Sequence, residues 1–178
     1  MKLKHILIAM GLSGALIGMA QAAPASSNTV SKKITLTAQI NDAMFVSKAD
    51  GSTWYETEEL EPVDYTQKAF SKTLPIRVWT KNSEFNVSLA QPLKLSNGSY
   101  EMTNTTVSIS HSGGEAAVTF GTPLKVTQTV VANGGYDEVH SLKIGAKAPI
   151  KTATGPSTNG SYSGELVMLF EPVAATGT

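Results

Sequence analysis

The chain has 178 residues, no cysteine, and equal numbers of basic and acidic side chains, 14 of each. The missing cysteine excludes disulfide bonds and the usual zinc and thiol chemistry, so packing and backbone hydrogen bonds must supply the stability. The balanced charge lacks the basic excess of nucleic-acid binders, and we expect no nucleic acid among the partners.

The N-terminus has the pattern of a secretory signal peptide. Lys2 and Lys4 precede an apolar run from Ile6 to Ala20, and small residues around Ala22 and Ala23 provide a cleavage site between those two residues. The run is shorter than the roughly 20 residues that span a membrane, which favours a signal over an anchor. We expect residues 1–22 to be removed, leaving an exported chain of one domain.

The mature sequence predicts β-strands almost throughout, because apolar and polar residues alternate and no window has a helical stripe. The clearest alternations cover residues 34–40, 74–78, 85–89, 124–130 and 166–170, and weaker ones cover residues 43–47, 107–110, 116–120 and 138–144. Turns are expected at Asp50-Gly51, Asn97-Gly98, Gly113-Gly114 and Asn133-Gly134-Gly135. The spacing predicts an all-β sandwich of two antiparallel sheets, with a closed barrel as the alternative.

The first predicted strand has one fully apolar face, formed by Ile34, Leu36, Ala38 and Ile40. Burying its three large side chains would contribute about 5–9 kcal/mol before ordering costs. The pattern alone favours the first strand of the chain's own domain, and the alternative is a strand that is added to another subunit. The preceding residues 23–31 are small and polar, as in a tail.

Four patches of sequence together resemble one known family. They are the run from Asn159 to Met168, the stretch from Lys33 to Asp42, the turn Ala49-Asp50-Gly51, and Val87-Ser88-Leu89-Ala90 with Pro92 and Leu95 nearby. In order and spacing they resemble the major pilins of the alternate-chaperone pathway, the class 5 fimbriae of colonization factor antigen I type. The sequence departs from the family in its lead of residues 23–31 and in Asp42, where the family has proline.

The resemblance implies an all-β, immunoglobulin-like antiparallel sandwich that is incomplete and is closed by a donor strand from a neighbouring subunit. It implies a signal peptide at residues 1–22, a tail and donor strand at 23–41, and a pilin domain at 42–178. The donor face would be Ile34, Leu36, Ala38 and Ile40. The expected partners are identical subunits, a periplasmic chaperone, an outer-membrane usher and a minor tip adhesin, and the expected location is a fimbria, reached through the periplasm.

No motif in the mature chain predicts an enzyme, a metal or a cofactor. His111 and His140 lack metal-ligand spacing and are expected at the surface or at a sheet edge. The acidic residues between Glu56 and Asp64 are interpreted as a solvated loop, and the run from Gly160 to Gly164 only partly imitates a nucleophile elbow.

Two other functions fit an exported β-sandwich. One is a monomeric secreted or periplasmic carbohydrate-binding protein, with Trp54, Tyr55 or Trp79 exposed on a groove. The other is the adhesive tip of a fimbria, but such tips carry an additional lectin domain for which the chain has no room.

Overall fold

The computed structural model describes residues 44–173, which form ten strands and no helix. No segment of this range is a helix long and apolar enough to cross a membrane. The signal peptide and the donor face predicted from the sequence lie outside the described residues. The strands are β1 (Met44–Lys48), β2 (Glu61–Pro62), β3 (Ala69–Thr80), β4 (Glu84–Leu89), β5 (Thr103–His111), β6 (Gly114–Ala117), β7 (Leu124–Thr127), β8 (Val131–Ala132), β9 (Gly135–Lys147) and β10 (Met168–Pro172).

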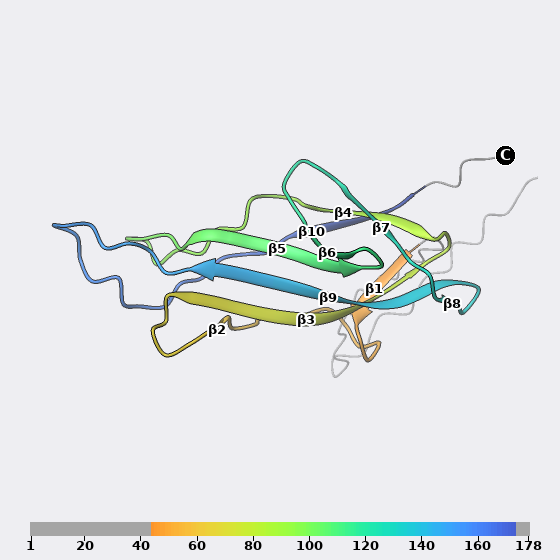
Figure 1. Ribbon diagram of the computed structural model, residues 1–178, viewed down its shortest axis with the longest axis horizontal. Helices are drawn as coiled ribbons and strands as arrows, with labels where there is room; N and C mark the ends of the chain where they lie inside the picture. Colours follow the sequence, from red (N-terminus) through yellow and green to blue (C-terminus); the bar gives the residue numbers. More distant parts are fainter. Residues whose placement is uncertain (1–43, 174–178) are drawn as a thin grey trace, which may run out of the picture. The chain divides into compact units, whose positions relative to one another are not determined.

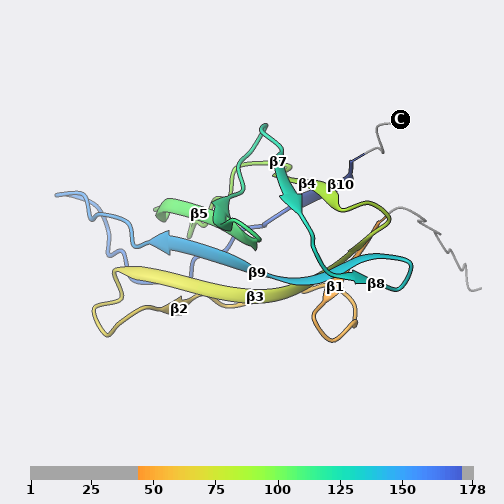
Figure 2. The same cartoon turned by 45° about the vertical axis from the view of Figure 1, so that its right-hand side comes forward.

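The strands form two antiparallel sheets. The larger sheet has the order β1-β3-β9-β5-β6, with β2 also paired to β3 and β8 to β9, and the smaller sheet has the order β10-β4-β7. The two views in Figures 1 and 2 place the smaller sheet over one face of the β3, β9 and β5 strands. The prediction of an all-β sandwich is confirmed, since no ladder within residues 44–173 closes the two sheets into a barrel.

The core lies between the sheets and follows the alternation seen in the sequence. Every second side chain of β3, β4 and β9 points inward, as expected for a sheet with one buried face. The large buried apolar residues of these strands are Leu74, Ile76, Val78, Phe85, Val87, Leu89, Leu142 and Ile144. Each such side chain contributes roughly 1.5–3 kcal/mol by leaving water, so the alternation accounts for most of the packing between the sheets.

The region after β7 differs from the sequence-based expectation. The alternation predicted a strand that continues to Val130, but β7 ends at Thr127 and Val130 is half exposed. The backbone N–H groups of Thr129 and Val130 donate to Oε1 of Glu138, at 2.6 and 2.7 Å, instead of to a neighbouring strand. A side chain therefore satisfies the donors that a ladder would otherwise have used.

His140 occupies a core position, and the prediction that it lies at the surface or a sheet edge is wrong. It is an inward-facing residue of β9, 2% exposed, with its ring edge against Phe85 at 5.6 Å between centroids. Its Nδ1 lies 2.8 Å from the carbonyl oxygen of Ser110, and its Nε2 has no hydrogen-bond partner among the described residues. Burial lowers the pKa of His140, opposed by the Ser110 carbonyl and the Glu138 carboxylate.

This burial predicts a pH-dependent stability. An unfolded histidine titrates near pH 6.5, and the folded His140 titrates lower, so the unfolded chain takes up the proton first. The contribution of His140 to the free energy of unfolding is complete above about pH 6.5 and falls as the pH drops through that value, by up to about 1.4 kcal/mol per pH unit. Urea unfolding followed by tryptophan fluorescence between pH 5 and 8 measures this slope.

Two variants separate His140 from the other groups that titrate in this range. His140→Phe should flatten the slope, while His111→Gln, on the partly exposed hairpin end of β5, should leave it in place. An unchanged slope in His140→Phe would show that other groups cause the loss of stability.

Candidate functional site

Strand β10 forms an unpaired edge of the smaller sheet. It pairs with β4 from Met168 opposite Leu89 to Pro172 opposite Phe85, and no described strand pairs with its other side. A row of β10 backbone groups therefore has no ladder partner within residues 44–173. Such an edge is a template for another strand.

The facing edge of the larger sheet is interrupted. Strand β1 pairs with the second half of β3, the chain then turns away at Asp50 and Gly51, and it rejoins β3 only where Glu61 lies opposite Ser71. Gly51 has a φ of 83°, and Asp50 Oδ1 accepts a hydrogen bond from the Ser52 N–H at 2.9 Å, which together fix the turn. Residues 53–60 consequently run beside β3 without pairing to it.

Tyr55 ties this unpaired segment to the sheet. Its hydroxyl donates to the carbonyl oxygen of Pro75, in the middle of β3, at 2.8 Å. Partial burial and the nearby carboxylates of Glu58 and Asp50 raise the pKa of Tyr55, so the hydroxyl keeps the proton that it donates. The segment is thus held along one side of the seam between the two sheets.

A hollow of about 370 Å³ lies between the loop that follows β1 and the segment that leads into β10, and we call it the seam groove. Its apolar lining consists of Leu60, Leu74, Leu93, Leu95, Ile144 and Leu166. Its rims are Trp54, Tyr55, Glu56 and Glu58 on one side and residues 164–167 on the other. Several of its residues pack against the core and yet stay only partly buried, so the core is open to solvent along the seam.

Trp54 closes the seam at one point. Its ring makes edge contacts with Tyr55, at 5.8 Å between centroids, and with Phe170 of β10, at 6.0 Å. Phe170 in turn lies against Phe85 in the core, at 6.3 Å. The loop that follows β1 is therefore joined to the smaller sheet through aromatic rings.

Gly164 brings the second rim close to the groove lining. A Cβ at this position would overlap the carbonyl oxygen of Lys94, so only glycine permits the approach. Next to it, Ser163 and Ser96 exchange two backbone hydrogen bonds, at 2.9 and 3.1 Å. Gly164 belongs to the run from Asn159 to Met168 that carries the family resemblance, but neither this resemblance nor the partial likeness to a nucleophile elbow predicted its close approach to Lys94.

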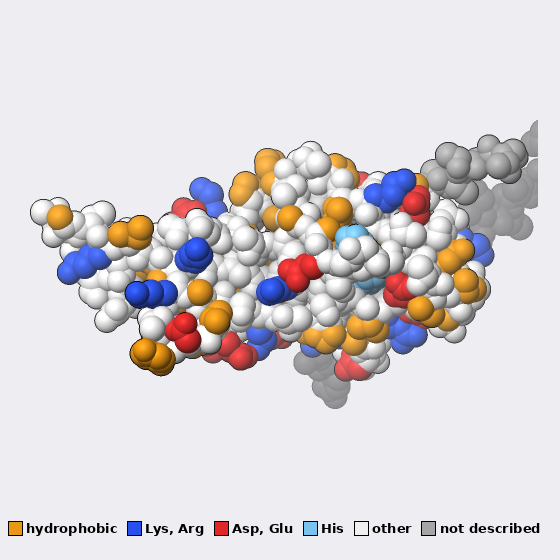
Figure 3. Space-filling model, in the orientation of Figure 1, with side chains coloured by type: hydrophobic (Ala, Val, Ile, Leu, Met, Phe, Trp, Pro, Cys, Tyr) orange, Lys and Arg blue, Asp and Glu red, His pale blue; other side chains and the backbone are white. Residues whose placement is uncertain are grey.

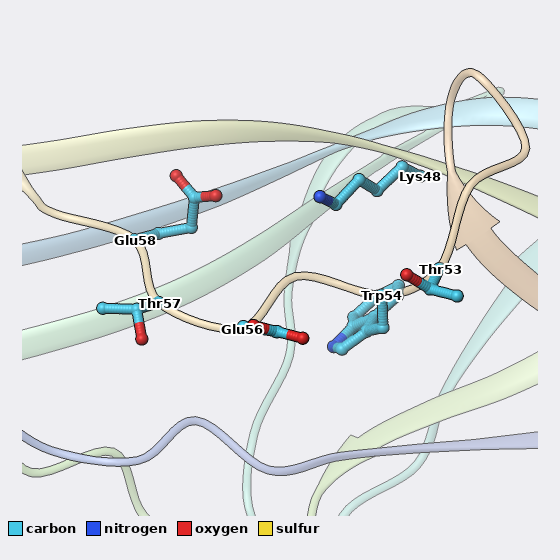
Figure 4. Close-up of a pocket in the computed structure, with 6 residues that line it drawn as sticks. All are labelled: Lys48, Thr53, Trp54, Glu56, Thr57 and Glu58. Carbon is cyan, nitrogen blue, oxygen red and sulfur yellow. The ribbon is translucent and has the colours of Figure 1, made fainter.

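The loop that follows β1 borders a second, more polar hollow of about 450 Å³, lined by Lys48, Thr53, Trp54, Glu56, Thr57 and Glu58. Figure 4 shows that the Glu56 and Glu58 side chains point in different directions. Lys48 Nζ lies 5.0 Å from the centre of the Tyr55 ring. No group of three or more potential metal ligands occurs in the part of the chain that the structure describes. The hollow has no converging set of catalytic groups.

The aromatic residues of the carbohydrate-binding alternative do not form one platform. Trp54 and Tyr55 lie in the seam, where their rings contact each other and Phe170. Trp79 lies on the opposite, outer face of the larger sheet, where it alternates with the buried Val78 and Thr80. Trp79 is therefore separated from Trp54 and Tyr55, which border the apolar seam groove.

Comparison with known proteins gives two findings. The family model of the CS1 type fimbrial major subunit matches residues 30–171. The solved structure of the CooA pilin subunit from enterotoxigenic Escherichia coli is similar in fold, with a TM-score of 0.59 and 17% sequence identity, over 76% of this chain and 90% of that chain. No curated protein sequence matches the chain.

The family match extends from ahead of β1 into β10 and so includes both edges of the seam groove. Major subunits of fimbriae are structural proteins that polymerise, and the fimbria is their place at the cell surface. The chain belongs to the CS1 type fimbrial major subunit family and is a structural pilin with an all-β fold.

Proposed function

We propose that consecutive subunits are joined by donor-strand complementation, in which residues 32–41 of one subunit occupy the seam groove of the next. The observation that carries the proposal is the unpaired edge of β10 beside an apolar opening into the core. A strand that covers the groove and continues along β10 would gain ladder hydrogen bonds from β10 and bury its apolar side chains in the groove.

The alternation of the donor segment matches such a groove. Ile34, Leu36, Ala38 and Ile40 would face the apolar lining, and the polar residues between them would face water. Burial of the three large side chains contributes about 5–9 kcal/mol before ordering costs, with the backbone hydrogen bonds in addition. The small Ala38 suits a narrow part of the groove.

Charge supports the same pairing. The groove rims carry Glu56, Glu58 and Glu165, all exposed, and the donor segment begins with Lys32 and Lys33. Opposite charges of this kind steer two surfaces together and raise the rate of encounter more than the final affinity. Exposed pairs add roughly 0–1 kcal/mol each, so the apolar contacts would dominate the stability of the joint.

An open groove and a free strand edge would make the unassembled subunit prone to aggregation. The proposal therefore includes export to the periplasm after cleavage between Ala22 and Ala23, and a periplasmic chaperone that covers the groove. An outer-membrane usher and a minor tip adhesin complete the expected partners. In this scheme residues 23–41 are the donor arm and residues 42–178 the body that receives a neighbour's arm.

A charge on the donor face should abolish assembly. Leu36→Asp places a carboxylate in the apolar groove, which costs several kcal/mol, and we expect SDS-resistant ladders of the mature chain to decrease at least 100-fold on electrophoresis. Thr37→Asp introduces the same charge on the opposite face and should retain ladders within about threefold. Equal loss in both variants, or a stable monomer in the unsubstituted chain, would contradict the proposal.

A charge in the acceptor groove should have the complementary effect. Leu166→Asp, in the groove lining, should weaken the binding of a fluorescent peptide of residues 32–41 by about 100-fold or more. Leu169→Asp is the matched control, because Leu169 lies on the outer side of β10 and is 45% exposed. Fluorescence anisotropy with chains that carry Leu36→Asp, and so cannot fill one another's grooves, measures both affinities.

If Leu166→Asp binds the peptide as tightly as the Leu169→Asp control and the parent chain, the seam groove is not the acceptor site.

A further inference from the structure

An apolar patch lies on the outer face of the larger sheet, beside the start of β1. Phe45 and Trp79 are directly opposite each other on β1 and β3, and Val139 lies on the next strand, opposite Arg77. Phe45 is 61% and Val139 57% exposed. We call these three residues the Phe45 patch. Large apolar side chains that gather on one exposed sheet face are typical of an interaction surface.

An ion pair lies within the Phe45 patch, on the same face of the sheet. Arg77, the only arginine of the chain, donates from Nε and Nη2 to the two carboxylate oxygens of Asp137, both at 2.7 Å. The Arg77 guanidinium holds the pKa of Asp137 below its usual value, and Asn133 adds a hydrogen bond to the same carboxylate at 2.8 Å. This bidentate pair crosses from β3 to β9 between the apolar side chains.

Trp79 is fixed by a glycine. A Cβ at Gly135 would clash with the carbonyl oxygen of Thr80 and lie 3.2 Å from the Trp79 ring, so the indole lies directly over the bare backbone of Gly135. The ring is therefore ordered before any partner arrives. A preorganised surface loses less conformational entropy on binding than a mobile one.

The connectivity of the chain indicates which partner covers the Phe45 patch. Ile40, the last residue of the donor face, is five residues from Phe45, and five residues span at most about 18 Å. The neighbouring subunit that holds Ile40 in its groove must therefore have its body within about 18 Å of Phe45 of the subunit that donates the strand. The patch is the exposed apolar surface that lies beside the exit of the donor arm.

We propose that the Phe45 patch is the contact surface for the body of the neighbouring subunit, the one that holds the donor strand. The inference rests on donor-strand complementation and adds a second contact to each joint. It is a head-to-tail contact, since the patch of one subunit meets a different surface of the next, and repetition of such a contact produces a filament. The strand makes the connection, and the patch fixes the angle between successive bodies.

The absence of cysteine allows a direct test, because a single introduced thiol is the only one in the chain. We would prepare fibres from Phe45→Cys and, as a control, from Tyr65→Cys, whose parent side chain is 95% exposed on the loop between β2 and β3. The rate of maleimide labelling in each fibre is divided by the rate in the urea-unfolded chain. We expect labelling at position 45 to be at least 10-fold slower than at position 65.

A second pair of measurements identifies what covers position 45. In chains that also carry Leu36→Asp, and so stay unassembled, labelling at position 45 should match that at position 65 within about twofold. Slow labelling in the unassembled chain would mean that the chain's own N-terminal residues cover the patch, and fast labelling in fibres would mean that nothing covers it. Either result overturns the inference.

Val139→Cys repeats the test on the same patch in case Phe45→Cys does not assemble. The outcome for the patch is separate from the outcome for the donor strand. If ladders form and depend on Leu36 while positions 45 and 139 label rapidly in the fibres, only the patch contact fails. If the unsubstituted chain forms no ladders, donor-strand complementation itself fails.

Discussion

The unpaired edge of β10 is the constraint on which the rest of the structure depends. A β-sandwich excludes water from its core only where both sheets are continuous along the seam, and here one sheet ends at β10 while the other leaves β3 after β1. The apolar residues along the seam pack against the core yet remain partly uncovered. In the proposed assembly, a strand from a neighbouring subunit would cover this opening in the part of the chain that residues 44–173 form.

Much of the fold follows from the sequence because period-two alternation is a local property. The inward and outward residues of β3, β4 and β9 are read directly from it, and the turn at Asn133-Gly134 is confirmed by positive φ angles of 54° and 75°. The alternation and the polarity of a side chain gave opposite expectations at one position. His140 is polar, so it was assigned to the surface, but its place in the alternation of β9 puts it in the core.

The seam groove could not be predicted in the same way. Its lining includes Leu60, Leu93 and Leu95, which lie outside the strands and therefore follow no period. Trp54 reaches the groove only because the chain leaves β3 after Gly51, and the contact with Phe170 joins residues that are far apart in the sequence. The family resemblance indicated that a groove should exist, and only the tertiary structure shows which side chains border it.

The hydrogen bond between Tyr55 and Pro75 has a consequence for where an incoming strand can pair. Pro75 has no N–H to offer, and its carbonyl oxygen is already occupied by the Tyr55 hydroxyl. Residues 72–75 of β3, which pair with neither β1 nor β2, are therefore poorly suited to pair with an incoming strand, although they lie along the same seam. Of the two backbone edges along the seam, β3 therefore offers fewer free donors and acceptors than β10, and the proposed donor strand would pair with β10 alone.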